Sequence, residues 1–334
     1  MDKERLLDCK DLRVSFFMTD SEVKAVRGVS YYVNRGEVVA VVGESGCGKS
    51  VTQMSMMQLI QTPPGKILSG DVVFDGIQLL KDGKPCAEMM DVRGNRIAMI
   101  FQEPMTSLNP VFRIGDQFVD VIRAHNKDMK KKEAWELGVK SLASVGIPDP
   151  EIRMRSYPFE LSGGMRQRVL IAFAVACEAD LIIADEPTTA LDVTVQAQVM
   201  ELLMDIKKRN NSSIIVVTHN LGLVSRYSDR IYVMYAGQIV ESGTAEDILT
   251  NPKHPYTLGL MAAVPKIEDE TKAELIPIEG APPSLAKLPE YCSFYPRCPY
   301  ATEACKSKPC PELKKIGDNE HMAACHMLEG ENLK

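Results

Sequence analysis

The sequence has neither an excess of positive charge nor a long apolar run. Lys and Arg number 39 against 45 Asp and Glu, which gives a formal net charge of -6. Nucleic-acid binding depends on clustered positive charge, so this balance argues against nucleic acid as a partner. The longest unbroken apolar run is the nine residues 169–177, whereas a membrane span needs about 20. We therefore expect a cytoplasmic protein that reaches a membrane only by docking onto other subunits.

The cysteines are unevenly distributed along an otherwise ordinary globular composition. Of the nine cysteines, five fall within residues 292–334. The usual C-x₂-C pair of a zinc knuckle is missing among them. In a reducing compartment such clustering favours metal ligands over disulfides. A length of 334 residues predicts roughly two domains at about 150 residues each.

The order of the predicted elements is that of an α/β fold. Residues 1–42 read as strands, and the run VVAVV, flanked by Gly36 and Gly43, is typical of a buried parallel strand. A helix is predicted over 49–61 and is ended by Pro63. Residues 105–158 read as a helical insertion. Two more buried strands, LIIAD and SIIVVT, follow, and a Pro-rich linker precedes the cysteine-rich tail.

Residues 43–50 lie between a predicted buried strand and a predicted helix, and they fit the G-x-x-x-x-G-K-[ST] pattern in the setting it requires. The glycines let backbone N–H groups close around phosphates, the lysine supplies a charge, and the last serine supplies a hydroxyl ligand for Mg²⁺. The cysteine of this loop is predicted to be a small neutral filler. The alternative hypothesis is that the positive field of the loop lowers the pKa of its thiol, so that thiol reagents block ATP binding. The predicted ATP-binding residues are Gly43, Glu44, Ser45, Gly46, Cys47, Gly48, Lys49 and Ser50.

Two adjacent carboxylates end the apolar stretch 181–184. We expect Asp185 to hold Mg²⁺ directly or through water. We expect Glu186 to orient and deprotonate the attacking water, and a general base in such a place contributes roughly 10²–10⁴ in rate.

A second anion-binding helix start is predicted at Ser162, Gly163 and Gly164. The N–H groups in the first turn of a helix lack partners within the helix, and the helix dipole is positive at that end. One nucleotide cannot easily use two separated helix starts of one chain. We therefore expect this one to serve the nucleotide of a partner subunit, which predicts a dimer.

In this order, GESGCGKS, Gln102 in IFQEP, LSGGMRQR, LIIADEP, ALD and VTHN resemble the nucleotide-binding subunit of an ABC transporter. The resemblance implies a P-loop NTPase cassette with a RecA-like mixed-sheet core, an antiparallel β subdomain and a helical subdomain. The implied domains are a cassette over 1–250, with its helical insertion at about 105–160, and a small Cys-rich C-terminal extension over 251–334.

The same resemblance implies roles for further residues. Gln102 contacts Mg²⁺ and the attacking water, and His219 steadies the γ-phosphate beside the general base. Asp192 belongs to the loop that couples two head-to-tail subunits, and the Ser-Gly-Gly helix start reaches the ATP of the opposite subunit. The aromatic ring that stacks on adenine is supplied by Phe16 or Phe17, and the sequence does not distinguish them.

The segments NPKHPYTLGLMAAVP, IEGAPPSL and CSFYPRCPYATEAC resemble the ATPases of oligopeptide and dipeptide importers and of their nickel-importing relatives. The implied assembly is a homo- or heterodimer of ATPases on the cytoplasmic face of the membrane, beneath two permease subunits that are fed by an extracellular solute-binding protein. The expected function is ATP hydrolysis that powers import of di- or oligopeptides. The alternatives are nickel or another small solute, or a soluble ABC ATPase acting outside transport.

The tail cysteines are spaced x₅, x₆ and x₁₉ over the four predicted ligands Cys292, Cys298, Cys305 and Cys325, which leaves Cys310 unused. Some members of the resembled subfamily bind a [4Fe-4S] cluster through such a set, and ligation by thiolates alone suits that group. Zn²⁺ is the alternative, since sites of four thiolates or of three thiolates and an imidazole are common. Unligated thiols are the third possibility.

Overall fold

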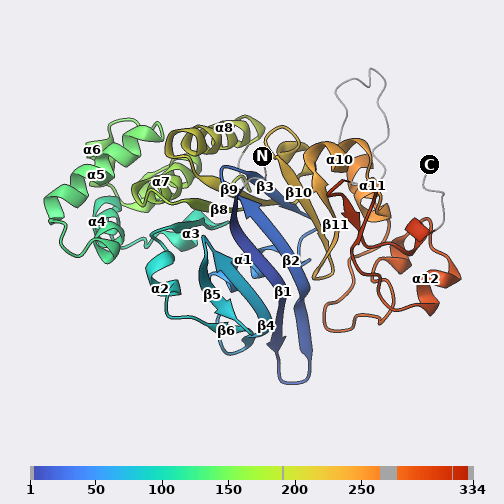
Figure 1. Cartoon of the computed structure of the whole chain (residues 1–334). Coiled ribbons are helices and arrows are strands. Elements are labelled where there is room, and N and C mark those ends of the chain that lie inside the picture. The colour runs from blue at the N-terminus through green and yellow to red at the C-terminus, as the bar shows by residue number, and fades with distance from the viewer. Residues whose placement is uncertain (1–3, 190–191, 264–276, 318, 330–334) are drawn as a thin grey trace, which may run out of the picture. The chain divides into compact units, whose positions relative to one another are not determined.

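The computed structural model describes residues 4–189, 192–263, 277–317 and 319–329 (Figure 1). Ala190 and Leu191 of the ALD sequence, and Val264 and Pro265 after the predicted helix, lie outside them. The chain forms two compact units, residues 1–87 with 218–334, and residues 88–217.

The first unit contains an antiparallel sheet in the order β2-β1-β4-β5-β6. Its two long strands confirm the strand character predicted for the start of the chain. Along β1 the buried Leu12 and Val14 alternate with the exposed Asp11 and Arg13, which is the pattern of a sheet with one covered face. The strands are β1 (Arg5–Phe17), β2 (Glu22–Asn34), β4 (Gly65–Phe74), β5 (Ile77–Lys81) and β6 (Lys84–Pro85).

The same unit holds a group of mixed strands in the order β12-β13-β11-β10-β3. The pair β3 and β10 is parallel, and β10 and β11 are antiparallel. All five residues of β3 are buried, as expected for a strand covered on both faces. The bounds are β3 (Val38–Val42), β10 (Arg230–Tyr235), β11 (Gln238–Thr244), β12 (Lys314–Lys315) and β13 (Met322–Ala323).

The helices of the first unit are short. The one after the phosphate loop ends at Met56, five residues before its predicted end, because Gln58 adopts a left-handed conformation and its side chain donates to the Leu79 carbonyl. A tertiary contact, and not Pro63, therefore stops this helix. The bounds are α1 (Lys49–Met56), α9 (Leu221–Val224), α10 (Ala245–Thr250), α11 (Pro255–Ala262) and α12 (Glu303–Ser307), with 3₁₀ turns at Tyr295–Arg297 and His326–Glu329.

The second unit has three parallel strands in the order β9-β8-β7, and the last residue of β9 already belongs to the first unit. Helices carry most of residues 104–160 (Figure 1). The strands are β7 (Ile97–Ile100), β8 (Leu181–Asp185) and β9 (Ser213–Thr218). The helices are α2 (Met89–Val92), α3 (Pro104–Ser107), α4 (Ile114–His125), α5 (Lys131–Ser144), α6 (Pro150–Met154), α7 (Gly163–Ala176) and α8 (Val193–Asn210), with a 3₁₀ turn at Pro158–Glu160.

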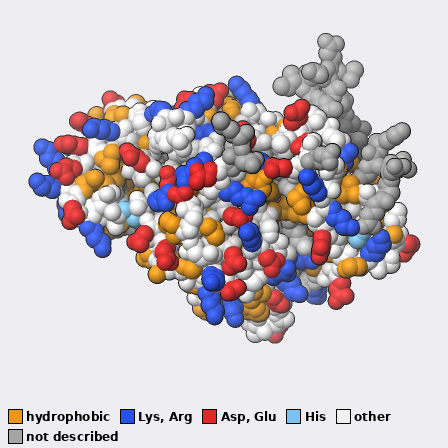
Figure 2. Space-filling view, in the orientation of Figure 1, with side chains coloured by type: hydrophobic (Ala, Val, Ile, Leu, Met, Phe, Trp, Pro, Cys, Tyr) orange, Lys and Arg blue, Asp and Glu red, His pale blue; other side chains and the backbone are white. Residues whose placement is uncertain are grey.

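The described surface carries both signs of charge close together. In Figure 2 basic and acidic side chains are interspersed over the visible face. Within the described residues, every helix is too short or too polar to cross a bilayer.

Candidate nucleotide site

The phosphate loop joins the buried strand β3 to α1, and its backbone requires glycine at two points. A Cβ atom at Gly43 would lie 2.2 Å from the Met234 carbonyl oxygen, and one at Gly48 would lie 2.3 Å from the Ala25 carbonyl oxygen. Gly48 also has φ 102°, which side-chain-bearing residues rarely adopt. The glycines of the sequence pattern are therefore fixed by the close approach of neighbouring backbone.

Lys49 points back into the loop. Its side chain is buried, and Nζ donates to the carbonyl oxygens of Gly43 at 2.8 Å and Glu44 at 3.0 Å. Ser45 and Gly46 are exposed at the crest of the loop, and Ser50 is half-buried in the first turn of α1. The loop thus places a positive charge and a helix start together, which suits it to hold phosphate groups.

Of the two hypotheses for Cys47, the lowered pKa is wrong. This residue is only 5% exposed, and burial raises the pKa of its thiol, while the charge of Lys49 lowers it by a smaller amount. Withdrawal from water disfavours a thiolate more than one nearby ammonium favours it. Cys47 therefore acts as a small neutral filler beneath the loop.

The two candidate aromatic rings differ in their surroundings. Phe17 ends β1 and is 48% exposed. Phe16 is half-buried, and its ring lies close to Gly65 on the neighbouring strand β4. Phe17 is therefore the ring that offers its face to another molecule.

In the second unit, the carboxylates predicted at the end of β8 are both buried, with Asp185 at 4% and Glu186 at 7% exposure. Glu186 Oε2 accepts hydrogen bonds from Gln102 Nε2 at 3.0 Å and from Thr189 Oγ1 at 2.8 Å. Its backbone N–H donates to the Val217 carbonyl at 2.8 Å. Gln102 and Glu186, both expected from the sequence, thus meet in this unit next to Asp185, and Thr189 is a partner that the sequence reasoning missed.

The backbone of Glu186 has φ 45°, a left-handed conformation that is uncommon outside glycine. Such residues persist only where their surroundings hold them, and they cluster at functional sites. Here the backbone bond to β9 and the two side-chain bonds hold the residue. The carboxylate therefore has a fixed position at the strand end.

Two helix starts of the second unit present polar residues at the surface. Ser162 is exposed at the N-cap of α7, where its Oγ accepts from Met165 N–H at 3.3 Å. Gly163 has open space around its Cα, since no atom lies within 4 Å of a built Cβ, while Gly164 packs against Val195 of α8. Asp192 caps α8 in the same way, accepting from Val195 N–H at 3.0 Å. His219 is exposed after β9 and belongs to the first unit.

The four predicted tail ligands line one small cavity of the first unit, together with His254 and His326. Burial is the main cause that raises the pKa of Cys292 to about 12 and that of Cys298 to about 11, and the neighbouring Cys325 and Cys305 thiols contribute to the shift of Cys298. Cys310 instead donates to Gln238 Oε1 at 3.3 Å, outside the lining of this cavity. Within the described residues, no three His, Cys, Asp or Glu side chains converge as the ligands of one metal ion do.

The fold, the phosphate loop and the carboxylates that follow β8 define an ABC cassette, a P-loop ATPase. Solved structures agree: the ABC transporter cassette of MJ0796, a dimer, is 25% identical with a TM-score of 0.63 and covers 72% of this chain and 98% of its own. cbiO1 from Clostridium perfringens, described as part of the transporter complex cbiONQ, is 25% identical with a TM-score of 0.61, over 75% of this chain and 92% of its own.

The chain belongs to the ABC transporter family. Residues 26–189 match the ABC transporter family, and residues 240–305 match the oligopeptide/dipeptide transporter C-terminal region. The oligopeptide transport ATP-binding protein OppD of Bacillus subtilis is 48% identical over 95% of this chain and 88% of its own length. The dipeptide transport ATP-binding protein DppD of the same organism is also 48% identical, over 90% of this chain and 89% of its own. This protein is therefore an ABC ATPase.

Proposed function

We propose that this ATPase powers the import of di- or oligopeptides through a membrane ABC transporter. The observation that carries the proposal is the match of residues 240–305 to the oligopeptide/dipeptide transporter C-terminal region, behind a cassette whose relatives are peptide transport ATP-binding proteins. The subunit lies peripherally on the cytoplasmic face of the membrane and contacts two permease subunits there.

The first unit binds the phosphates of ATP. N–H groups of residues 43–50 and the start of α1 surround the phosphate oxygens, and Lys49 exchanges its carbonyl partners for the β- and γ-phosphates. The exposed Phe17 ring stacks on adenine. The proposed Mg²⁺ donors are the oxygens of Ser50, Gln102 and Asp185, a set that fits a hard cation. Mg²⁺, when bound, neutralises charge on the transferred phosphate.

Hydrolysis depends on Glu186 as general base. Water attacks the γ-phosphorus, the bond from phosphorus to the β–γ bridging oxygen breaks, and the proton of the water passes to the Glu186 carboxylate, leaving ADP and phosphate. Hydrogen bonds from Gln102 and Thr189 fix the carboxylate plane, so the base does not have to be reoriented during the reaction. His219 steadies the γ-phosphate.

Two such subunits work head to tail, as a homo- or heterodimer. The exposed starts of α7 and α8, with Ser162, Gly163, Gly164 and Asp192, face the nucleotide of the opposite subunit. The open space at Gly163 supports this arrangement, because another molecule can approach the backbone closely there.

The tail cysteines hold a metal group, for which we propose a [4Fe-4S] cluster on Cys292, Cys298, Cys305 and Cys325. In support, the four thiols line one cavity, and ligation by thiolates alone suits such a cluster. The group, when bound, pins a tail too small to form a core of its own. Iron and sulfide analysis of anaerobically purified protein tests this, and a colourless preparation with stoichiometric zinc and no iron contradicts it.

The transport proposal is tested by reconstituting the chain with its neighbouring ATPase, permease and binding-protein subunits in vesicles. We expect ATP hydrolysis to increase several-fold on addition of di- or oligopeptides with the binding protein, and radiolabelled peptide to accumulate. Accumulation of nickel with no response to any peptide length would contradict the peptide assignment while leaving the ATPase assignment intact.

A further inference from the structure

The C-terminal extension contacts the phosphate loop through one arginine. Arg297 lies in the 3₁₀ turn Tyr295–Arg297, and its side chain is 5% exposed. It donates from Nη1 to Glu44 Oε2 at 2.6 Å and from Nη2 to Glu44 Oε1 at 2.9 Å. Glu44 is the second residue of the loop. A two-pronged arginine–carboxylate pair of this kind fixes orientation as well as distance.

The rest of the Arg297 guanidinium group is also bound. Nε donates to the Glu279 carbonyl at 3.0 Å, and Nη1 lies 3.4 Å from the Tyr235 hydroxyl of β10. Hydrogen bonding to Glu44 raises the pKa of Arg297 above its usual range, so the group stays charged. The extension thus supplies a cation whose position is also fixed by partners other than Glu44.

The backbone of Glu44 is held by a second residue. Its N–H donates to the hydroxyl oxygen of Tyr256, a fully buried residue of α11, at 2.8 Å. The Tyr256 ring packs against Tyr235 at 4.6 Å and against Phe294 of the extension at 5.5 Å between ring centroids. The Glu44 carbonyl is also one of the two acceptors of Lys49 Nζ.

We propose that Arg297 is a positioning residue of the nucleotide site, and that the ATP affinity of this chain depends on its contact with Glu44. By fixing Glu44, it fixes the conformation of the loop and thus the position of the N–H groups that follow, which surround the phosphates. The inference rests on the loop being the ATP site and does not depend on what the transporter carries.

The test is a double-mutant cycle on the purified full-length chain, read out as the Kd of a fluorescent ATP analogue with Mg²⁺. Arg297→Met and Glu44→Gln each raise Kd about tenfold, a coupling of the size found for contacting charged residues. The double variant binds the analogue no more weakly than the weaker-binding of the two single variants. Tyr256→Phe keeps the ring packing, removes the hydroxyl acceptor and raises Kd several-fold.

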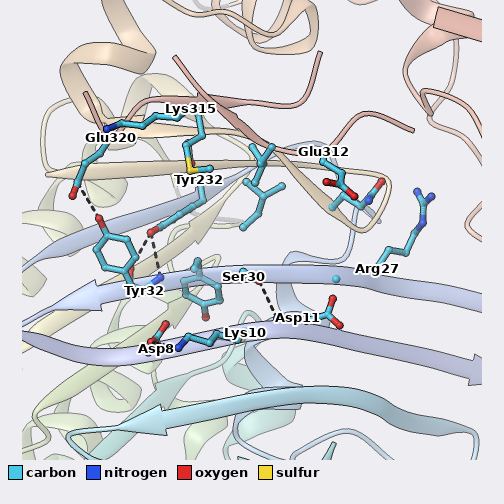
Figure 3. Close-up of a pocket in the computed structure, with 18 of the residues that line it drawn as sticks. Asp8, Lys10, Asp11, Arg27, Ser30, Tyr32, Tyr232, Glu312, Lys315 and Glu320 are labelled. Carbon is cyan, nitrogen blue, oxygen red and sulfur yellow. Dashed lines mark hydrogen bonds and ion pairs between the residues drawn. The ribbon is translucent and has the colours of Figure 1, made fainter. Parts of the chain in front are cut away.

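The matched control is Glu320→Gln, which removes the carboxylate charge from a different ion pair between the extension and the strands of the same unit. Glu320 accepts from Arg230 at 2.7 Å and from the Tyr32 hydroxyl at 2.9 Å, at the edge of a cavity of about 750 Å³ (Figure 3). The Kd of the Glu320→Gln variant stays within twofold of that of the parent chain.

An unchanged Kd in Arg297→Met overturns the proposal. It is also overturned if Arg297→Met raises Kd by the same factor in the Glu44→Gln background as in the parent chain. An equal loss in Glu320→Gln also overturns it, because general loosening of the extension would then be sufficient. Should Arg297→Met fail to fold, Tyr256→Phe and Glu44→Gln decide, and an unchanged Kd in both counts against the proposal. A failure of peptide transport leaves every one of these binding results unaffected.

Discussion

At the scale of single residues, Glu186 and Asp185 are held differently, which fits the separate roles proposed for them. The two side chains are neighbours in sequence, yet Glu186 takes a left-handed backbone conformation and accepts bonds from Gln102 and Thr189. Its orientation is therefore set by Gln102 from another segment and by Thr189 three residues further along the chain, while Asp185 remains the last residue of β8.

Replacing Glu186 by Gln tests the base assignment. The amide keeps the size and hydrogen-bonding shape of the side chain but cannot take a proton. We expect ATP binding within about twofold of the parent and hydrolysis lower by roughly 10²–10⁴, with a closed dimer accumulating in gel filtration with ATP. Glu201→Gln, an exposed carboxylate on α8, is the control and retains turnover. Parental turnover in Glu186→Gln would show that another group is the base.

Cys47 shows what a local motif cannot reveal. The sequence places it in a positively charged loop, and from that alone a lowered pKa is a reasonable prediction. The opposite shift arises because the thiol is covered by residues distant in sequence: Met234 approaches within 2.2 Å of where a Gly43 Cβ would lie, and Cys47 Sγ is within 2.9 Å of the same point. Burial is a tertiary property, and no window of eight residues contains it.

A raised pKa has a direct consequence for reactivity. Less of the Cys47 thiol is thiolate at neutral pH, and only the thiolate is nucleophilic. We expect iodoacetamide at pH 7.5 to label the half-exposed Cys86 before Cys47, as followed by peptide mass spectrometry over time. Protein unfolded in urea is the control, in which the two rates converge. Faster labelling of Cys47 in the folded protein would contradict the effect of burial.

At the scale of elements, the parts of the fold with periodic or fully apolar sequence were predictable. β3, β8 and β9 are buried at every position and mostly apolar, and the phosphate loop and the Ser-Gly-Gly helix start lie where the patterns place them. Element ends that depend on tertiary contacts were not predictable from the sequence. Helix α1 stops at Met56 because the Gln58 side chain bonds to Leu79 of β5. This contact has no signal in the local sequence.

The start of α7 allows a test of the proposed contact in trans. Gly163→Asp fits the folded chain, because the position is open and because the positive end of the helix dipole stabilises a carboxylate in the first helical turn. ATP binding by the isolated subunit is therefore unchanged. In the dimer the carboxylate faces the phosphates of the opposite nucleotide, and hydrolysis falls by about 10²-fold or more. The measurements are analogue Kd and steady-state ATPase rate, with Gly163→Ala as the uncharged control. Full hydrolysis in Gly163→Asp would place α7 away from any nucleotide.

At the scale of the whole molecule, the sequence separates cassette and extension, while the structure joins the extension to the phosphate loop of the same unit. The Arg297–Glu44 pair spans 253 residues of sequence, and neither residue stands out by type, so spacing alone could not reveal it. The four tail cysteines were predictable as a set because they are clustered in sequence. The sequence does not predict that they share a cavity whose lining includes His254.

The last prediction concerns this cavity. Cys298→Ser removes one of the four lining thiols, so we expect bound metal to fall below one equivalent and the melting temperature to drop by roughly 5 °C or more, since the tail loses its main constraint. Cys298 follows Arg297 directly, and the variant therefore also weakens binding of the ATP analogue. Cys310→Ser, at the cysteine outside the cavity, is the matched control and keeps metal, stability and affinity. Equal metal loss in both variants would contradict the four-cysteine assignment. Unchanged metal content and melting temperature in Cys298→Ser would show that its thiol is not a ligand.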